Sequence, residues 1–161
     1  MAENKTTHVL VVDDEKMVVE NLVEFLRLIG HHAVAAYGGK EALEAFRNGT
    51  FDLVITDLMM PDMDGIELMG AIKAIDANTP VLIITGHGTI ESATAAIKKG
   101  AYDFIPKPFN LSELEVIASR ALEHRELTRQ LGLFRKLTLA LVISVPVWVL
   151  AGAAVAVWGP W

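Results

Sequence analysis

The sequence predicts an α/β fold in which five parallel strands form a doubly wound sheet covered by helices on both faces. Short apolar runs rich in β-branched residues alternate five times with amphipathic, helix-like segments, and this alternation is typical of a parallel sheet with right-handed crossovers. The connections between the segments are short. No G-x-G-x-x-G turn follows the first apolar run, so a dinucleotide-binding version of this fold is not supported.

The strands are apolar runs bounded by turn residues, and the helices have apolar residues that recur every three or four positions. Strands are expected at residues 9–12, 32–36, 51–56, 80–85 and 101–106. Helices are expected at residues 17–29, 39–48, 66–75 and 89–99, and from Ser112 onward. Ser112 and Glu115 have the spacing of a capping box. The last helix is expected to continue past Gly132, because one glycine weakens a helix but need not break it.

The charge of the chain is unevenly distributed. Residues 1–119 contain 9 Lys and Arg against 18 Asp and Glu, a formal balance of −9, whereas residues 120–161 contain 5 against 2, a balance of +3. The acidic balance of the larger part argues against a nucleic-acid-binding surface, which needs clustered Lys and Arg. The chain contains no cysteine, which excludes disulfides, zinc–thiolate sites and thiol catalysis.

Polar side chains stand at the carboxyl ends of four predicted strands. They are Asp13 and Asp14 after the first, Asp57 after the third, Thr85 at the end of the fourth and Lys107 after the fifth. One such aspartate alone is most often an ordinary loop residue, but parallel strands bring these residues to one edge of the sheet. Carboxylates that meet there need a cation, and an all-oxygen ligand set favours Mg²⁺. Because Lys107 and Thr85 suit phosphate oxygens, we predict a phosphoryl-transfer site with Asp57 as nucleophile.

The motifs around these residues resemble the receiver domain of response regulators in two-component signalling. The matching motifs are Val-Val-Asp13-Asp14-Glu15, Thr56-Asp57-Leu-Met-Met-Pro-Asp-Met-Asp-Gly65, Ile-Thr85-Gly-His and Asp-Phe104-Ile-Pro-Lys107-Pro108-Phe. The resemblance covers residues 7–125, and the sequence from Thr85 to Phe109 is most similar to receivers of nitrogen-regulation-type transcriptional activators. It implies a flavodoxin-like sheet with the strand order 2-1-3-4-5.

The resemblance also implies a role for each site residue. Asp57 is the phosphoacceptor, and Mg²⁺ is bound by Asp14, Asp57 and the Met59 main-chain carbonyl, with Asp13 helping through water. Thr85 and Lys107 hold the phosphoryl oxygens. Phe104 is the aromatic switch that turns inward when Thr85 moves, and the Lys107–Pro108 peptide bond is cis. The phosphoryl donor is a sensor histidine kinase or a phosphotransfer protein, and no enzymatic activity is expected beyond self-phosphorylation and self-dephosphorylation.

The carboxyl-terminal part predicts a membrane anchor. Residues 137–161 contain no charged residue, and about 20 apolar residues are enough for a helix to cross a bilayer. Arg129, Arg135 and Lys136 precede this run, which favours a single-pass helix in the inner membrane with the rest of the chain in the cytoplasm. We therefore expect a receiver domain at residues 1–125, a helical linker with a basic flank at 126–136 and a transmembrane helix at 137–161. A buried helix or an oligomer core is the alternative for the tail, and its small-residue spacings are compatible with a homodimer.

The expected output is contact with another protein, for which a membrane complex is one candidate. About 36 residues follow position 125 and most are apolar, so they contain no helix-turn-helix with which to read DNA. One alternative is an adaptor that works without phosphorylation. Another is a hydrolase of the haloacid-dehalogenase type, but such enzymes need a second aspartate where Met59 stands. Asp62-Met63-Asp64-Gly65 resembles part of a calcium-binding loop, yet the remaining spacing is missing, and a turn followed by a helix is expected.

Overall fold

The computed structural model describes residues 7–86 and 89–158, without the side chains of residues 133, 135–137 and 139–158 in the last helix. The chain divides into two compact units, Met1–Arg125 and Glu126–Trp161. The predicted membrane-spanning segment, residues 137–161, lies almost entirely outside the residues described with their side chains. Among the residues that are described, no helix is both long and apolar enough to cross a membrane.

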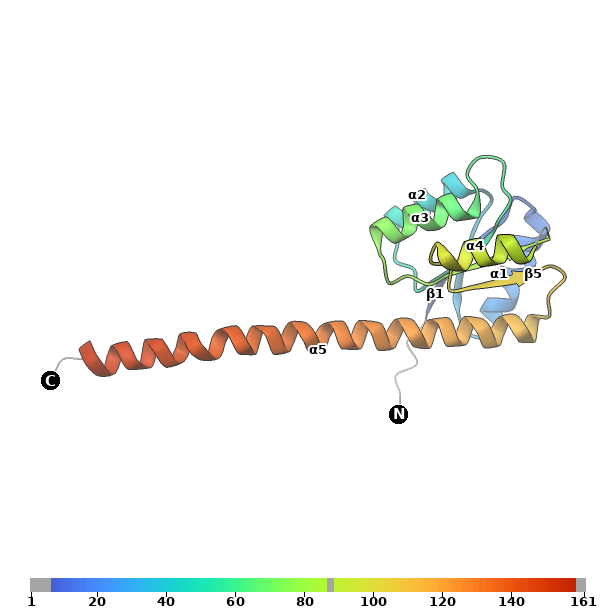
Figure 1. Cartoon of the computed structure of the whole chain (residues 1–161). Coiled ribbons are helices and arrows are strands. Elements are labelled where there is room, and N and C mark those ends of the chain that lie inside the picture. Colours follow the sequence, from blue (N-terminus) through green and yellow to red (C-terminus); the bar gives the residue numbers. More distant parts are fainter. Residues whose placement is uncertain (1–6, 87–88, 159–161) are drawn as a thin grey trace. The chain divides into compact units, whose positions relative to one another are not determined.

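The first unit is built from alternating strands and helices around one parallel sheet (Figure 1). In chain order the elements are β1 (His8–Val12), α1 (Lys16–Leu28), β2 (His32–Ala36), α2 (Gly39–Asn48), β3 (Leu53–Asp57), α3 (Gly65–Ile75), β4 (Val81–Thr85), α4 (Ile90–Lys98), β5 (Asp103–Pro106) and α5 (Leu111–Trp158). The strand order is β2-β1-β3-β4-β5 with parallel pairing throughout. The predicted fold class and strand order are therefore confirmed.

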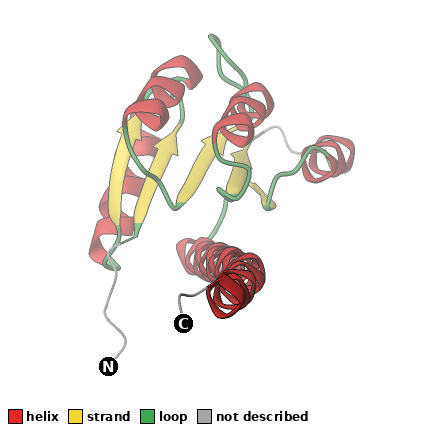
Figure 2. Ribbon diagram, turned by 90° about the vertical axis from the view of Figure 1, so that its left-hand side faces the viewer, coloured by secondary structure: helices red, strands yellow, loops and turns green. Residues whose placement is uncertain are grey.

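The sheet is buried on both faces, with helices on either side of the strands (Figure 2). Successive side chains of a strand point to opposite faces, and β1 shows this directly. Leu10 and Val12 belong to one core cluster with residues of α2, α3 and α4, whereas Val9 and Val11 belong to another with residues of α1 and α5. Burial on both faces explains why the strands read as continuous apolar runs in the sequence.

The predicted capping box at the start of the last helix is wrong. The helix begins at Leu111, and the side-chain oxygen of Asn110 accepts a hydrogen bond of 2.9 Å from the Ser112 amide. Asn110 is thus the capping residue, and Ser112 lies in the first turn. Asparagine caps a helix at least as well as serine, which explains why the earlier start prevails.

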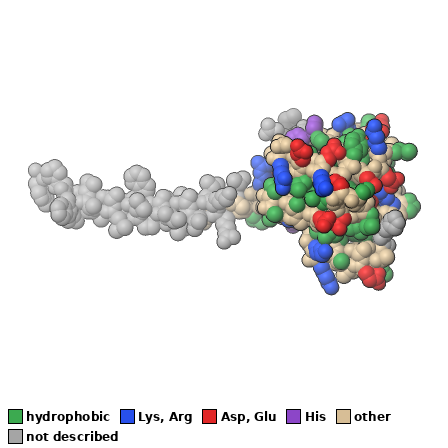
Figure 3. Space-filling model, turned by 90° about the horizontal axis from the view of Figure 1, so that it is seen from above, with side chains coloured by type: hydrophobic (Ala, Val, Ile, Leu, Met, Phe, Trp, Pro, Cys, Tyr) green, Lys and Arg blue, Asp and Glu red, His purple; other side chains and the backbone are tan. Residues whose placement is uncertain are grey.

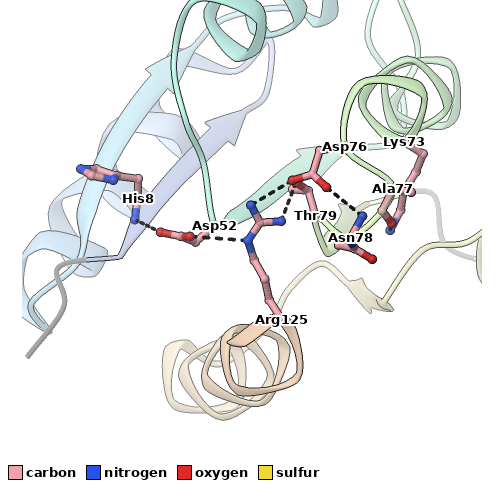
Figure 4. A network of polar contacts seen from close by, with 8 residues as sticks. All are labelled: His8, Asp52, Lys73, Asp76, Ala77, Asn78, Thr79 and Arg125. Atoms are coloured by element: carbon pink, nitrogen blue, oxygen red, sulfur yellow. Dashed lines mark hydrogen bonds and ion pairs between the residues drawn. The ribbon is translucent and has the colours of Figure 1, made fainter. Parts of the chain in front are cut away.

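Arg125 fastens α5 to the sheet edge where the strands begin (Figure 4). Its Nη2 lies 3.0 Å from Asp76 Oδ2, its Nη1 donates to Thr79 Oγ1 at 2.7 Å, and its Nε lies 3.5 Å from Asp52 Oδ1. Asp52 in turn accepts a hydrogen bond from the His8 main-chain amide at 3.0 Å. This Arg125 clasp joins α5 to the start of β3 and to the loop between α3 and β4.

Candidate functional site at the carboxyl edge of the sheet

The polar residues predicted to meet do lie at one edge of the sheet. Asp57 and Thr85 are the last residues of β3 and β4, and Asp13 and Lys107 directly follow β1 and β5. Main-chain hydrogen bonds extend this order beyond the strands, because the Lys107 amide donates to the Thr85 carbonyl at 2.9 Å. The side chains of Asp13, Asp57 and Thr85 are buried. Two carboxylates and a hydroxyl are therefore shielded from bulk water at the carboxyl-terminal edge of the sheet.

The ammonium group of Lys107 lies among the acids. Its Nζ is 2.6 Å from Asp13 Oδ2 and 3.2 Å from Asp57 Oδ1. Glu15 is a third partner at 3.7 Å. Glu15 directly follows the acid pair in the sequence but is not among the residues predicted for the site. Its side chain is 69% exposed, so this contact adds little to stability.

Burial is the main influence on the ionisation of the Asp57 carboxylate. Burial raises the pKa of Asp57, and the charge of Asp13 raises it further. The hydrogen bond from the Met59 amide and the charge of Lys107 lower the pKa, but they do not cancel the rise. The Met59 amide donates to Asp57 Oδ2 at 2.6 Å. Burial alone would lower the pKa of Lys107, but its bond and charge interactions with Asp13 and Asp57 raise it. Lys107 therefore stays charged, but its charge does not fully offset the burial of the Asp57 carboxylate.

The donor set fits Mg²⁺. Asp13 and Asp57 supply buried carboxylates, the exposed Asp14 stands beside them, and Met59 adds a main-chain carbonyl two residues after Asp57. Within the described part of the chain, no three His, Cys, Asp or Glu side chains form a ready metal cluster. Mg²⁺ does not need one, because it keeps several waters and is usually held by one or two carboxylates.

The other predicted residues lie around this centre. The Met59 side chain is 59% exposed. Phe104 is half-buried and packs against the core cluster that contains residues of α2, α3 and α4. The Lys107–Pro108 peptide bond is cis. Two further polar residues, Asp62 and Arg125, make long-range contacts that no local sequence pattern reveals, since their partners are 22 to 73 residues away.

Comparisons with known proteins agree with this geometry. The family model described as response regulator receiver domain matches residues 9–119. The chain is 40% identical over 116 residues to the transcriptional regulatory protein ZraR of Escherichia coli (strain K12), covering 72% of this chain and 26% of that protein. It is 40% identical over 132 residues to the nitrogen assimilation regulatory protein NtrX of Azorhizobium caulinodans, covering 81% of this chain and 29% of that protein. The chain thus spans less than a third of the length of these curated relatives.

Solved structures show the same fold. NtrX from Brucella abortus superposes with a TM-score of 0.76 at 38% identity, over 81% of this chain and 30% of that one. A response regulator receiver domain protein from Clostridium thermocellum superposes with a TM-score of 0.72 at 31% identity, over 76% of this chain and 98% of that one. With the family model covering most of the first unit, this chain belongs to the response regulator receiver domain family of two-component signalling.

Proposed function

We propose that this protein is a signalling switch in which Asp57 accepts a phosphoryl group from a sensor histidine kinase or a phosphotransfer protein. The observation that carries the proposal is the buried Asp57 carboxylate held between the Met59 amide and the Lys107 ammonium, beside Asp13. Receiver domains are phosphorylated on an aspartate and dephosphorylate themselves. No other enzymatic activity is proposed.

In the forward step, an Asp57 carboxylate oxygen attacks the phosphorus of a phosphohistidine. The P–N bond breaks, its electron pair goes to the imidazole nitrogen, and an acyl phosphate forms. Lys107 and the hydroxyl of Thr85 hold the phosphoryl oxygens, and Phe104 responds to the movement of Thr85. Asp14, Asp57 and the Met59 carbonyl, with Asp13 through water, would hold Mg²⁺, which would supply positive charge to neutralise those oxygens. In the reverse process, water attacks the phosphorus, the P–O bond to Asp57 breaks, and inorganic phosphate leaves.

The direct test is labelling of the full-length chain by a small phosphodonor such as acetyl phosphate. We expect labelling that depends on Mg²⁺ and is absent in Asp57→Asn. Asp103→Asn is a matched control, because Asp103 lies at the opposite end of β5 and accepts a local hydrogen bond from the Phe104 amide. A wild-type chain that does not label would contradict the proposal.

We further propose that residues 137–161 anchor the protein in the inner membrane with the receiver domain in the cytoplasm. The support is the absence of charge over this stretch and the basic residues Arg129, Arg135 and Lys136 before it. Cell fractionation of the full-length chain against a chain truncated after Gly132 tests this. A full-length chain that remains soluble without detergent would contradict the anchor.

The output is proposed to be protein contact, with a membrane complex as one candidate partner. On the face shown in Figure 3, acidic and basic side chains are interspersed rather than gathered into one basic patch. The names of the relatives favour a second candidate, a receiver that controls transcription, because ZraR is named a transcriptional regulatory protein. Capture of partners by the membrane-bound form, with and without the phosphoryl mimic beryllofluoride, separates these outputs. Capture that is the same for wild type and Asp57→Asn would instead favour an adaptor that works without phosphorylation.

A further inference from the structure

Helix α2 begins without a capping side chain of its own. The residue before it is Gly38, which has no side chain with which to cap the helix. The first amides of a helix have no partners within the helix, so those of α2 need acceptors from elsewhere. Asp62, in the loop between β3 and α3, supplies them. Its Oδ2 accepts a hydrogen bond from the Lys40 amide at 2.9 Å, and its Oδ1 accepts one from the Gly39 amide at 3.1 Å. The bond from the Lys40 amide contributes most to holding the pKa of Asp62 below its ordinary value.

The glycine pair at the start of α2 makes room for this loop. A Cβ atom on Gly38 would lie 3.1 Å from Asp62 Oδ1, and one on Gly39 would lie 2.5 Å from the main-chain oxygen of Met63. The second distance is too short for any side chain, and the atom it meets belongs to the backbone. Gly38 and Gly39 therefore allow residues 62–63 to rest directly on the amino terminus of α2.

The same loop is fixed at its other end to α3. Asp64 Oδ1 accepts from the Glu67 amide at 2.7 Å, and Glu67 Oε2 accepts from the Asp64 amide at 3.1 Å. The Gly65 amide donates to the Leu58 carbonyl at 2.9 Å. The loop that starts at Asp57 and carries Met59 is thus held by α3 on one side and by α2 on the other.

We propose that Asp62 is a positioning residue for the phosphoryl-transfer site, because its clamp on α2 fixes the loop that presents Met59. The Met59 amide contacts Asp57 directly, and its carbonyl belongs to the donor set for Mg²⁺. Without the clamp, the loop loses its hydrogen bonds to the start of α2, and the Met59 carbonyl is less well placed for the metal. This inference rests on the proposed function, since it requires Mg²⁺ at Asp57.

The test is calorimetric titration of Mg²⁺ into the full-length chain. We expect Asp62→Ala to raise the Kd for Mg²⁺ by about tenfold, the lower end of what loss of an outer-shell partner costs. Asp62→Asn keeps one acceptor oxygen and is expected to lie between wild type and Asp62→Ala. It also keeps the test decisive if Asp62→Ala does not fold.

Thr89→Ala is the matched control for loss of a helix cap. Thr89 Oγ1 accepts from the Ser92 amide at 3.1 Å at the start of α4, so its removal costs a cap without touching the β3–α3 loop. We expect the Kd for Mg²⁺ to be unchanged. An equal rise in Thr89→Ala and Asp62→Ala would show a general effect of destabilisation and would overturn the inference.

The Mg²⁺ dependence of labelling gives a second readout. In Asp62→Ala the half-saturating Mg²⁺ concentration should rise by the same factor, while the maximal labelling rate at saturating Mg²⁺ stays at the wild-type level. If wild type labels and Asp62→Ala has an unchanged Kd, the clamp has no positioning role and the proposed function still stands. If wild type neither binds Mg²⁺ nor labels, both fail together.

Discussion

The burial that suits Asp57 to phosphoryl transfer lowers the stability of the folded protein. Burial and the charge of Asp13 raise its pKa, so the folded protein binds its proton more tightly than the unfolded chain. For a carboxyl group with a raised pKa, the favourable contribution to folding is present at low pH and is lost as the pH rises through the folded-state pKa. At neutral pH without Mg²⁺, the charged Asp57 therefore opposes folding.

We predict that Asp57→Asn without Mg²⁺ has a higher free energy of unfolding than wild type at about pH 7. The difference should shrink as the pH falls toward 3.8, the ordinary aspartate pKa. Urea unfolding across this pH range measures it, and Asp103→Asn should show no comparable pH-dependent gain. Added Mg²⁺ should stabilise wild type more than Asp57→Asn, because the variant lacks one carboxylate of the donor set and a ligand stabilises the state that binds it more tightly. A wild type more stable than Asp57→Asn at neutral pH without metal would contradict the argument.

Gly65 is fixed by sterics beside the phosphoacceptor. A Cβ atom there would lie 2.2 Å from the Asp57 main-chain oxygen, and neither backbone segment can move aside without shifting the site. We expect Gly65→Ala to lower the free energy of unfolding by about 1–3 kcal/mol, as overpacking does, and to slow labelling of Asp57. Gly70 in the same helix has nothing within 4 Å of a Cβ, so Gly70→Ala should stabilise by about 1 kcal/mol. Urea unfolding of both variants separates sterics from helix propensity, and two changes of equal sign would contradict the steric reading.

Among the elements, α5 depends on contacts that its own sequence does not suggest. Its apolar side contributes Leu114, Ala118 and Ala121 to the core, but the Arg125 clasp reaches Asp76 and Thr79, 49 and 46 residues away. The Arg125 side chain is 18% exposed, so the clasp is only partly screened by water. Its loss would leave Asp52 and Asp76 without their shared cation.

We predict that Arg125→Met lowers the free energy of unfolding by about 1.5–3 kcal/mol, the usual contribution of hydrogen bonds to charged groups. Chemical denaturation measures the loss, with Arg120→Met as a control on an exposed position of the same helix. In a double-mutant cycle, Asp76→Asn should cost less in the Arg125→Met background than in wild type. Fully additive losses would show that the two side chains do not act together.

The strands and helices could largely be predicted from the sequence, whereas the long-range polar contacts that hold them together could not. Each predicted strand, and each predicted helix up to residue 99, has bounds within two residues of those observed, and the last helix begins one residue earlier than predicted. Apolar runs and turn residues act locally, which is why these elements could be predicted. The edge that gathers Asp13, Asp57, Thr85 and Lys107 followed from parallel topology alone. The Asp62 clamp and the Arg125 clasp could not be predicted, because each joins segments brought together only by the finished fold. The Gly38-Gly39 pair, opening a helix with no polar cap, was the one local sign that something else would rest there.

At the scale of the whole molecule, the second unit has an exposed apolar stripe. Leu127, Leu131 and Phe134 are 54%, 69% and 66% exposed, and Thr138 follows them on α5. The steps of four, three and four residues are those of a heptad repeat, which places these side chains along one seam of a helix. A seam of this spacing can pack against the same seam on a second copy of the chain, and such pairing would bring together the two tails that are proposed as membrane anchors.

The absence of cysteine from the chain allows a direct test of this pairing. We predict that Leu131→Cys in the full-length chain forms a disulfide-linked dimer under mild oxidation, because residues on the seam face each other across a two-helix coiled coil. Arg129→Cys introduces an equally exposed thiol two residues earlier, on the side of the helix away from the seam, and should remain monomeric. Non-reducing gel electrophoresis distinguishes them. Equal cross-linking of both variants would indicate random collision, and no cross-linking of Leu131→Cys would contradict pairing of two copies along the stripe.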